Sequence, residues 1–182
     1  MSRFDVTDTA IAGVRVIERH KIGDSRGFLE RVFCLDSLSG AGIKPVRQIN
    51  RTLTRQQGAV RGMHFQYPPA AEVKLVTCLA GKVFDVAMDL RRGSETFGNW
   101  VGVELDGQGE RSLLIPEGCA HGFQTLTPDC ELLYVHSHDY APEHESGVNP
   151  YSAGIEWPLD VTQTSQRDAA LPALGEIEGI AL

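Results

Sequence analysis

Short runs of apolar residues alternate with turn-forming residues along most of the chain. Clusters of Gly, Pro, Asp and Ser separate the runs, and each run has a length typical of a β-strand. Strands are predicted at residues 14–17, 28–35, 46–54, 59–66, 73–79, 83–90, 100–105, 112–115, 122–126 and 131–136. This spacing predicts an all-β sandwich or barrel. Residues 165–174 instead predict a short helix.

The 182 residues are expected to form a single domain, 1–182. We expect an N-terminal arm at 1–13 and a C-terminal helical tail at 160–182. Lys and Arg number 17 against 24 Asp and Glu, which leaves a net charge of −7. This balance disfavours a nucleic-acid-binding protein and a protein that binds anionic membranes. Any anionic ligand must therefore be held by a few well-placed cations.

The cysteines indicate a reducing compartment. Cys34, Cys78, Cys119 and Cys130 lack the close paired spacing of a zinc site, and Cys78 lies in an apolar run typical of a buried free thiol. The N-terminus has no apolar segment typical of export, and no run is long enough to span a membrane. We therefore expect a cytoplasmic protein.

One turn is typical of cupin-type jelly rolls. Residues 116–121 (PEGCAH) form a Pro-x-Gly-x-x-His motif that ends at His121. In metal-binding cupins an earlier strand supplies a His-x-His pair, whereas the earlier strand here supplies His64 and Gln66. An amide is a poor ligand for transition metals. We therefore expect a cupin-like frame without a metal site.

His64 has two interpretations. A neutral imidazole is a suitable general base near neutral pH, provided that a carboxylate orients its other nitrogen. The alternative is a hydrogen-bonded core histidine. The remaining histidines, His20, His136, His138 and His144, are predicted to lie at the surface or at exposed strand ends.

Lys74 and Tyr134 are also ambiguous. Lys74 is the one charged residue in the apolar run 73–79. It either points into the barrel, where it needs an anion or a polarised oxygen, or lies on an edge strand and extends its stem to water. Tyr134 is typical of a core tyrosine with a hydrogen-bonded hydroxyl.

Arg26 and Arg61 are candidate phosphate ligands because arginine matches phosphate with two parallel hydrogen bonds. The pattern alone favours surface ion pairs for both. The sequence has neither a P-loop nor a GxGxxG motif, so side chains would have to bind any nucleotide. Asp168 follows Ser165 by three residues, which favours a helix capping box.

Several motifs together resemble the nucleotide-sugar 3,5-epimerases of the deoxysugar pathway, the family of dTDP-4-dehydrorhamnose 3,5-epimerase. The resemblance extends from about residue 14 to about residue 172. It rests on residues 23–28 (GDSRGF), 61–66 (RGMHFQ), 74–76 (KLV), 83–91 (VFDVAMDLR), 96–98 (TFG), 115–123 (IPEGCAHGF) and 155–158 (IEWP). It implies a cupin-type jelly roll, a homodimer that exchanges N-terminal strands, and catalysis without a metal or other cofactor.

The resemblance also implies a substrate and a set of residue roles. The substrate would be a nucleotide-diphosphate 4-keto-6-deoxysugar, inverted at C-3, C-5 or both through enolate intermediates. His64 would be the base and Asp168 the carboxylate that orients it. Lys74 would stabilise the charge on the C-4 oxygen, and Tyr134 would be the acid on the opposite face of the sugar. The residues implied to line the pocket are Arg26, Glu30, Gln48, Asn50, Arg61 and His121, with Arg26 and Arg61 on the diphosphate.

Some positions differ from the pattern of this family, namely residues 149–151 (NPY), Cys119 and residues 51–52 (RT). They leave open the sugar, the nucleotide base and the number of inverted centres. A mono-epimerase that acts at C-3 or C-5 alone is therefore one alternative. A non-catalytic cupin that binds nucleotide sugars is a second, and a metal-dependent cupin oxygenase is a third.

Overall fold

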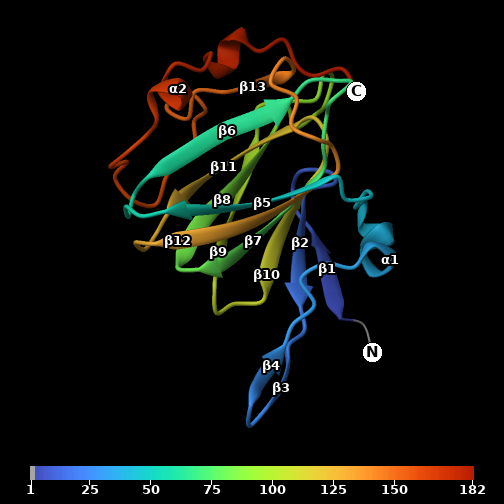
Figure 1. The fold of residues 1–182 in the computed structure, drawn as a ribbon. Coiled ribbons are helices and arrows are strands. Elements are labelled where there is room, and N and C mark those ends of the chain that lie inside the picture. Colours follow the sequence, from blue (N-terminus) through green and yellow to red (C-terminus); the bar gives the residue numbers. More distant parts are fainter. Residues whose placement is uncertain (1–2) are drawn as a thin grey trace.

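The computed structural model describes residues 3–182, and strands dominate it (Figure 1). The strands are β1 (Phe4–Asp8), β2 (Arg15–Arg19), β3 (Ile22–Asp24), β4 (Gly27–Leu29), β5 (Gln48–Thr54), β6 (Val60–Gln66), β7 (Lys74–Ala80), β8 (Lys82–Asp89), β9 (Trp100–Asp106), β10 (Arg111–Ile115), β11 (Cys119–Thr125), β12 (Cys130–His136) and β13 (Glu145–Gly147). The helices are α1 (Leu35–Leu38) and α2 (Gln166–Ala169), and short 3₁₀ turns lie at Ser39–Ala41 and Leu174–Glu176. Within residues 3–182, no helix is long and apolar enough to cross a membrane.

Two antiparallel sheets form the body of the molecule. The six-stranded sheet has the order β1-β2-β10-β7-β12-β5, and the five-stranded sheet has the order β13-β6-β11-β8-β9. Alternate side chains of both sheets meet in one apolar cluster, to which Val76 and Leu132 contribute from the first sheet and Ala87 from the second. The predicted all-β jelly roll is confirmed, and Cys78 is a buried free thiol as expected.

The C-terminal tail covers the outer face of the five-stranded sheet. Phe65 and Met88 on that face pack in one cluster with Ile177 and Ile180 of the tail. The predicted helix at 165–174 is shorter than expected, because α2 ends at Ala169. Pro172 follows shortly afterwards, and a proline disfavours helical geometry at the residue before it, here Leu171. The tail is therefore mostly irregular chain fastened by apolar contacts.

Residues 20–35 differ most from the prediction. The strand expected at 28–35 is wrong: β3 and β4 form an isolated two-stranded hairpin that projects from the body, and α1 begins at Leu35 (Figure 1). Phe28 and Leu29 on this hairpin are 63% and 64% exposed. Because they do not pack against the core, burial does not favour a longer strand here. The N-terminal arm expected at 1–13 falls partly on residues 1–2, outside the described residues. Its described part includes β1, which pairs with β2 of the same sheet.

Candidate active site

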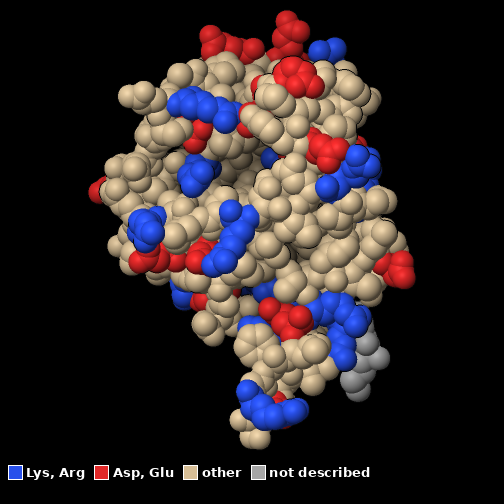
Figure 2. Space-filling view, viewed as in Figure 1, with Lys and Arg blue, Asp and Glu red and all other residues tan. Residues whose placement is uncertain are grey.

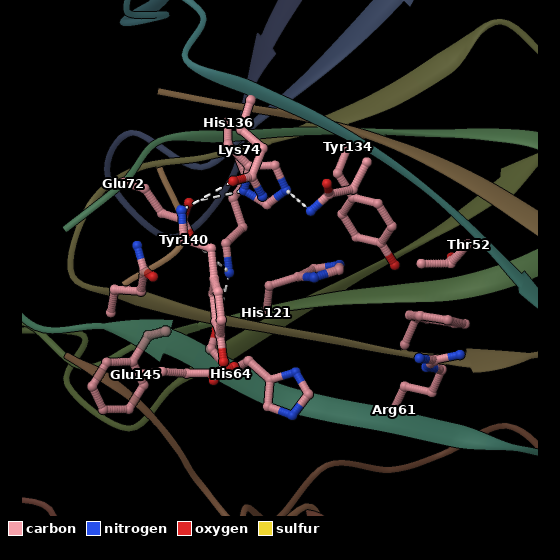
Figure 3. A pocket seen from close by; sticks show the side chains of 15 residues that line it. Thr52, Arg61, His64, Glu72, Lys74, His121, Tyr134, His136, Tyr140 and Glu145 are labelled. Atoms are coloured by element: carbon pink, nitrogen blue, oxygen red, sulfur yellow. Dashed lines mark hydrogen bonds and ion pairs between the residues drawn. The ribbon is translucent and has the colours of Figure 1, made fainter. Parts of the chain in front are cut away.

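One pocket opens between the two sheets, where their free edges face each other. β5 ends the six-stranded sheet, and β13 and β6 end the five-stranded sheet. The pocket has a volume of about 240 Å³, and Figure 2 shows a hollow on this face bordered by basic side chains. Its lining residues are Gln48, Asn50, Thr52, Arg61, His64, Phe65, Gln66, Glu72, Lys74, His121, Phe123, Tyr134, His136, Tyr140 and Glu145 (Figure 3).

An irregularity in β6 brings Arg61 and His64 to the same pocket. His64 pairs with His121 of β11, and Arg61 pairs with Phe123, so three steps along β6 match two steps along β11. Without this extra residue, side chains three positions apart would point to opposite faces of the sheet. β6 therefore contains a β-bulge between Arg61 and His64, and this bulge shapes the pocket wall.

Asp168 binds both the bulge and His64. Its Oδ1 lies 2.8 Å from Nε2 of His64, and its Oδ2 accepts a hydrogen bond of 3.1 Å from the Gly62 amide. Burial by itself would raise the pKa of Asp168, but these hydrogen bonds and the nearby imidazole outweigh it and lower the pKa. An ionised carboxylate requires a proton on Nε2, which leaves Nδ1 of His64 as the basic nitrogen.

The serine half of the predicted capping box lies beside this contact. The hydroxyl of Ser165 accepts a hydrogen bond of 3.0 Å from the Asp168 amide at the start of α2. The backbone of Asp168 is thus fixed by the cap, while its carboxylate extends to β6. The serine half of the predicted capping box is therefore present, whereas the Asp168 carboxylate binds Gly62 and His64.

Lys74 and Tyr134 lie on the opposite wall, on the six-stranded sheet. Lys74 is buried on β7, an interior strand, so the alternative of an edge-strand lysine is wrong. Its Nζ donates to the His64 carbonyl at 3.3 Å and lies 3.2 Å from Oε1 of Glu72. Burial, and then the charge of Asp85, raises the pKa of Tyr134, so the phenol stays protonated at neutral pH.

Two further histidines in the pocket are each bound to a carboxylate. Nε2 of His121 lies 2.7 Å from Oδ1 of the buried Asp85, and Nδ1 of His136 lies 2.8 Å from Oε2 of Glu72. The prediction that His136 is solvent-exposed is wrong, because it is buried and its ring stacks on Tyr134 with centroids 5.9 Å apart. Three imidazole–carboxylate pairs therefore border one cavity.

These groups fit proton transfer better than metal binding. Gln66, at the position of the second metal-binding histidine in metal cupins, uses its amide to fasten the loops at Ala70 and Ala141. Within residues 3–182, no group of three or more His, Cys, Asp or Glu side chains is placed to hold a metal ion. The pocket does combine a base, a cation and a protonated phenol, which suits removal and return of a proton beside a carbonyl group.

Comparison with known proteins agrees with this chemistry. Residues 8–176 match the model of the family described as dTDP-4-dehydrorhamnose 3,5-epimerase. The chain belongs to this epimerase family. It is 41% identical over 177 residues to the dTDP-4-dehydrorhamnose 3,5-epimerase of Salmonella typhimurium, covering 94% of this chain and 96% of the relative.

Solved structures of epimerases share the fold over nearly the whole chain. One is a dTDP-6-deoxy-D-glucose-3,5-epimerase from Legionella pneumophila in complex with dTDP-4-keto-L-rhamnose, with a TM-score of 0.92, 37% identity and 98% coverage of both chains. Another is a 3'-monoepimerase from Streptomyces bikiniensis in complex with dTDP-quinovose, with a TM-score of 0.86, 34% identity, and coverage of 92% of this chain and 86% of that one.

Most of the expected epimerase residues meet in the pocket. The lining includes Gln48, Asn50, Arg61, His64, Lys74, His121 and Tyr134, and Asp168 lies directly behind His64. The surface ion pair favoured for Arg61 is wrong: within residues 3–182 its side chain pairs with no carboxylate and instead donates a 3.4 Å hydrogen bond to the Thr54 hydroxyl.

Arg26 and Glu30 do not line the pocket of their own chain. The Arg26 side chain is 87% exposed on the projecting hairpin and pairs with Asp24. Glu30 accepts a hydrogen bond of 2.9 Å from Nε of Arg19. The expectation that these two residues line the pocket is therefore not met within a single epimerase chain.

Sequence reasoning missed several pocket residues, notably Glu72, His136, Tyr140 and Glu145. A signal existed for His136, because it follows Tyr134 by two residues and shares its face of β12. Glu72 and Tyr140 lie in loops, where alternation predicts nothing. Glu145 lies on β13, which is too short to show a pattern.

Proposed function

We propose that this epimerase inverts one or both of the carbons flanking the ketone of a dTDP-linked 4-keto-6-deoxyhexose. The observation that carries the proposal is the convergence of the His64–Asp168 pair, Lys74 and Tyr134 on one pocket. The Legionella structure, a complex with dTDP-4-keto-L-rhamnose, supports the substrate class.

The reaction begins at a carbon acidified by the neighbouring ketone. Nδ1 of His64 removes the proton, and Asp168 stabilises the imidazolium that forms. The electron pair moves into an enolate whose negative charge develops on the C-4 oxygen. Lys74 stabilises this charge where it forms, so that it lowers the barrier more than it tightens ground-state binding.

Inversion requires the proton to return from the opposite face of the sugar. His64 extends from β6 in one sheet and Tyr134 from β12 in the other. A flat enolate between these walls would have the base on one side and the phenol on the other. Proton return from Tyr134 then gives the inverted centre and leaves a phenolate at Tyr134 and an imidazolium at His64. Solvent returns a proton to Tyr134 and takes one from His64, and the same steps at the second carbon then give the double epimer.

We also propose that the working form is a homodimer in which the β3–β4 hairpin of one chain reaches the pocket of the other. The exposed Phe28 and Leu29 give the hairpin an apolar surface to bury. Arg26 near its tip would then bind the diphosphate of a substrate held by the partner. This arrangement would reconcile the expected role of Arg26 with its distance from the pocket of its own chain.

Proton NMR of dTDP-4-keto-6-deoxyglucose with the enzyme in deuterium oxide tests the proposal. The wild type should replace the hydrogens at C-3, C-5 or both with deuterium. In His64→Asn the exchange should fall by a factor of about 10² to 10⁴, because the general base is gone. Thermal unfolding of the variant serves as the control for its fold. Exchange at the wild-type rate in this variant would refute the assignment, and tight binding without exchange by the wild type would indicate a binding module.

A mono-epimerase is the second candidate. The Streptomyces bikiniensis 3'-monoepimerase shares 34% identity with this chain and the same fold, so the family's fold supports single inversion as well. The same spectra distinguish the two activities. Deuterium at both carbons with two inverted products indicates a 3,5-epimerase, and deuterium at C-3 alone indicates a mono-epimerase.

A further inference from the structure

The ammonium group of Lys74 has two partners and one remaining donor. An ammonium carries three N–H bonds, and here one is directed at the His64 carbonyl and one at Glu72. The side chain is 9% exposed on an interior strand, so its main access to water is through the pocket itself. The third N–H is free for an oxygen of the substrate.

Glu72 joins Lys74 to His136. Its Oε1 lies 3.2 Å from Nζ of Lys74, and its Oε2 lies 2.8 Å from Nδ1 of His136 (Figure 3). Burial alone would raise the pKa of Glu72, but the hydrogen bond from His136 and the charge of Lys74 lower it, so the carboxylate is ionised. His136 therefore donates from Nδ1.

The other ring nitrogen of His136 contacts Asn50, which extends the chain of contacts from Lys74 through Glu72 and His136. Its Nε2 lies 3.4 Å from Nδ2 of Asn50, which is a donor, so the geometry fits a neutral imidazole with its proton on Nδ1. In this arrangement Glu72 is the counter-charge of Lys74, and His136 fixes the orientation of the carboxylate. Asn50 in turn fixes the ring.

We propose that Glu72, held by His136, is a positioning residue that keeps Lys74 protonated and directs its free N–H at the C-4 oxygen of the substrate. The proposal rests on the epimerase function given above. Its physical basis is that a buried ammonium without a counter-charge favours loss of its proton. An unprotonated Lys74 could not stabilise the enolate.

The other charged groups of the pocket do not replace Glu72. The remaining titratable side chains that face this cavity are Arg61, His64, His121, Tyr134, Tyr140 and Glu145. Glu145 is the other carboxylate among them, and it pairs at 2.6 Å with Arg167 rather than with Lys74. It therefore provides a matched control, because Glu145→Gln removes the same charge from the same cavity.

The direct test is an NMR titration of the protein without substrate. The chain has four lysines, Lys21, Lys44, Lys74 and Lys82, so ¹³C-labelled lysine gives few signals, and Lys74→Arg assigns one of them. In Glu72→Gln the titration midpoint of Lys74 should fall by about one to three pH units relative to the wild type. In Glu145→Gln it should stay at the wild-type position, and in Glu72→Asp it should lie between the two.

Activity provides the second readout. In the pH profile of kcat/KM for deuterium exchange, the fall at high pH should begin at a lower pH in Glu72→Gln than in the wild type. It should begin at the wild-type pH in Glu145→Gln. If the Glu72–Lys74 ion pair were purely structural, its loss in Glu72→Gln would lower the unfolding temperature without changing the pH at which kcat/KM falls. If Glu72→Gln does not fold, Glu72→Asp keeps the test open, because its weaker contact should still lower the midpoint.

The outcomes separate this proposal from the function. No exchange by the wild type would overturn the proposed function, while the lysine titration would still report on Glu72. Normal exchange by the wild type together with unchanged Lys74 midpoints in both Glu72 variants would overturn the positioning role alone.

Discussion

At the residue scale, the two oxygens of Asp168 have separate partners, and this division fixes the proton on His64. Oδ2 accepts the Gly62 N–H, so Oδ1 is left for His64. In Asp168→Asn the amide oxygen should keep the Gly62 contact, and the amide nitrogen would then donate to Nε2 of His64. The imidazole proton would move to Nδ1, the basic nitrogen. We expect the exchange rate to fall by a factor of about 10² to 10⁴ with little change in KM, measured by NMR in deuterium oxide.

The same carboxylate gives a pH dependence of stability. The folded-state pKa of Asp168 is lowered below its ordinary value of 3.8. Its contribution is therefore fully present above the ordinary value and is lost as the pH falls through the folded-state value. The difference in unfolding free energy between the wild type and Asp168→Asn should narrow on acidification below about pH 4. A difference that widens in acid would contradict this assignment.

At the scale of elements, the interior strands were predictable as short apolar runs between turn residues, and the contacts between distant segments were not. β7 buries residues on both faces, so Lys74 stood out in the sequence as the one charged residue of an apolar run, whereas Tyr134 on β12 was typical of a core residue. The partner of His64 lies 104 residues away, and no local pattern joins the two. The β3–β4 hairpin was mispredicted because it leaves the core, so burial does not select its length.

The bulge in β6 is an element that a single substitution tests. Gly62 has φ of +107°, and a Cβ there would lie 2.6 Å from the His121 carbonyl oxygen and from Cα of Gly122. Gly62→Ala should lower the unfolding free energy by about 3 kcal/mol or more, since backbone strain and a backbone clash add. Gly154→Ala is the matched control, with φ of +66° and nothing within 4 Å. It should cost about 1 kcal/mol in the same urea titration. Equal costs for the two variants would show that the close approach to β11 is unimportant.

At the scale of the whole molecule, a single chain leaves apolar side chains exposed on its projecting hairpin and on the edge strand beside its pocket. The hairpin exposes Phe28 and Leu29, and the edge strand β5 beside the pocket exposes Ile49 and Leu53. Apolar surface of this kind favours association, and a homodimer would bury it. Light scattering should give a particle with twice the 19.9 kDa mass of one chain.

A hybrid dimer distinguishes an Arg26 that serves the partner from one that serves its own chain. Arg26→Ala should weaken substrate binding by a factor of about 10 to 100, the cost of a lost hydrogen bond to a charged group, and His64→Asn should remove the base. In the hybrid of these two variants, the pocket with an intact His64 faces an intact hairpin from its partner. The hybrid, isolated by two different tags and assayed below KM, should therefore recover about half of the wild-type exchange rate, because one of the two sites of a C₂ dimer is complete. If Arg26 served its own pocket, both sites of the hybrid would be defective, and the exchange rate would not exceed the mean of the two parents.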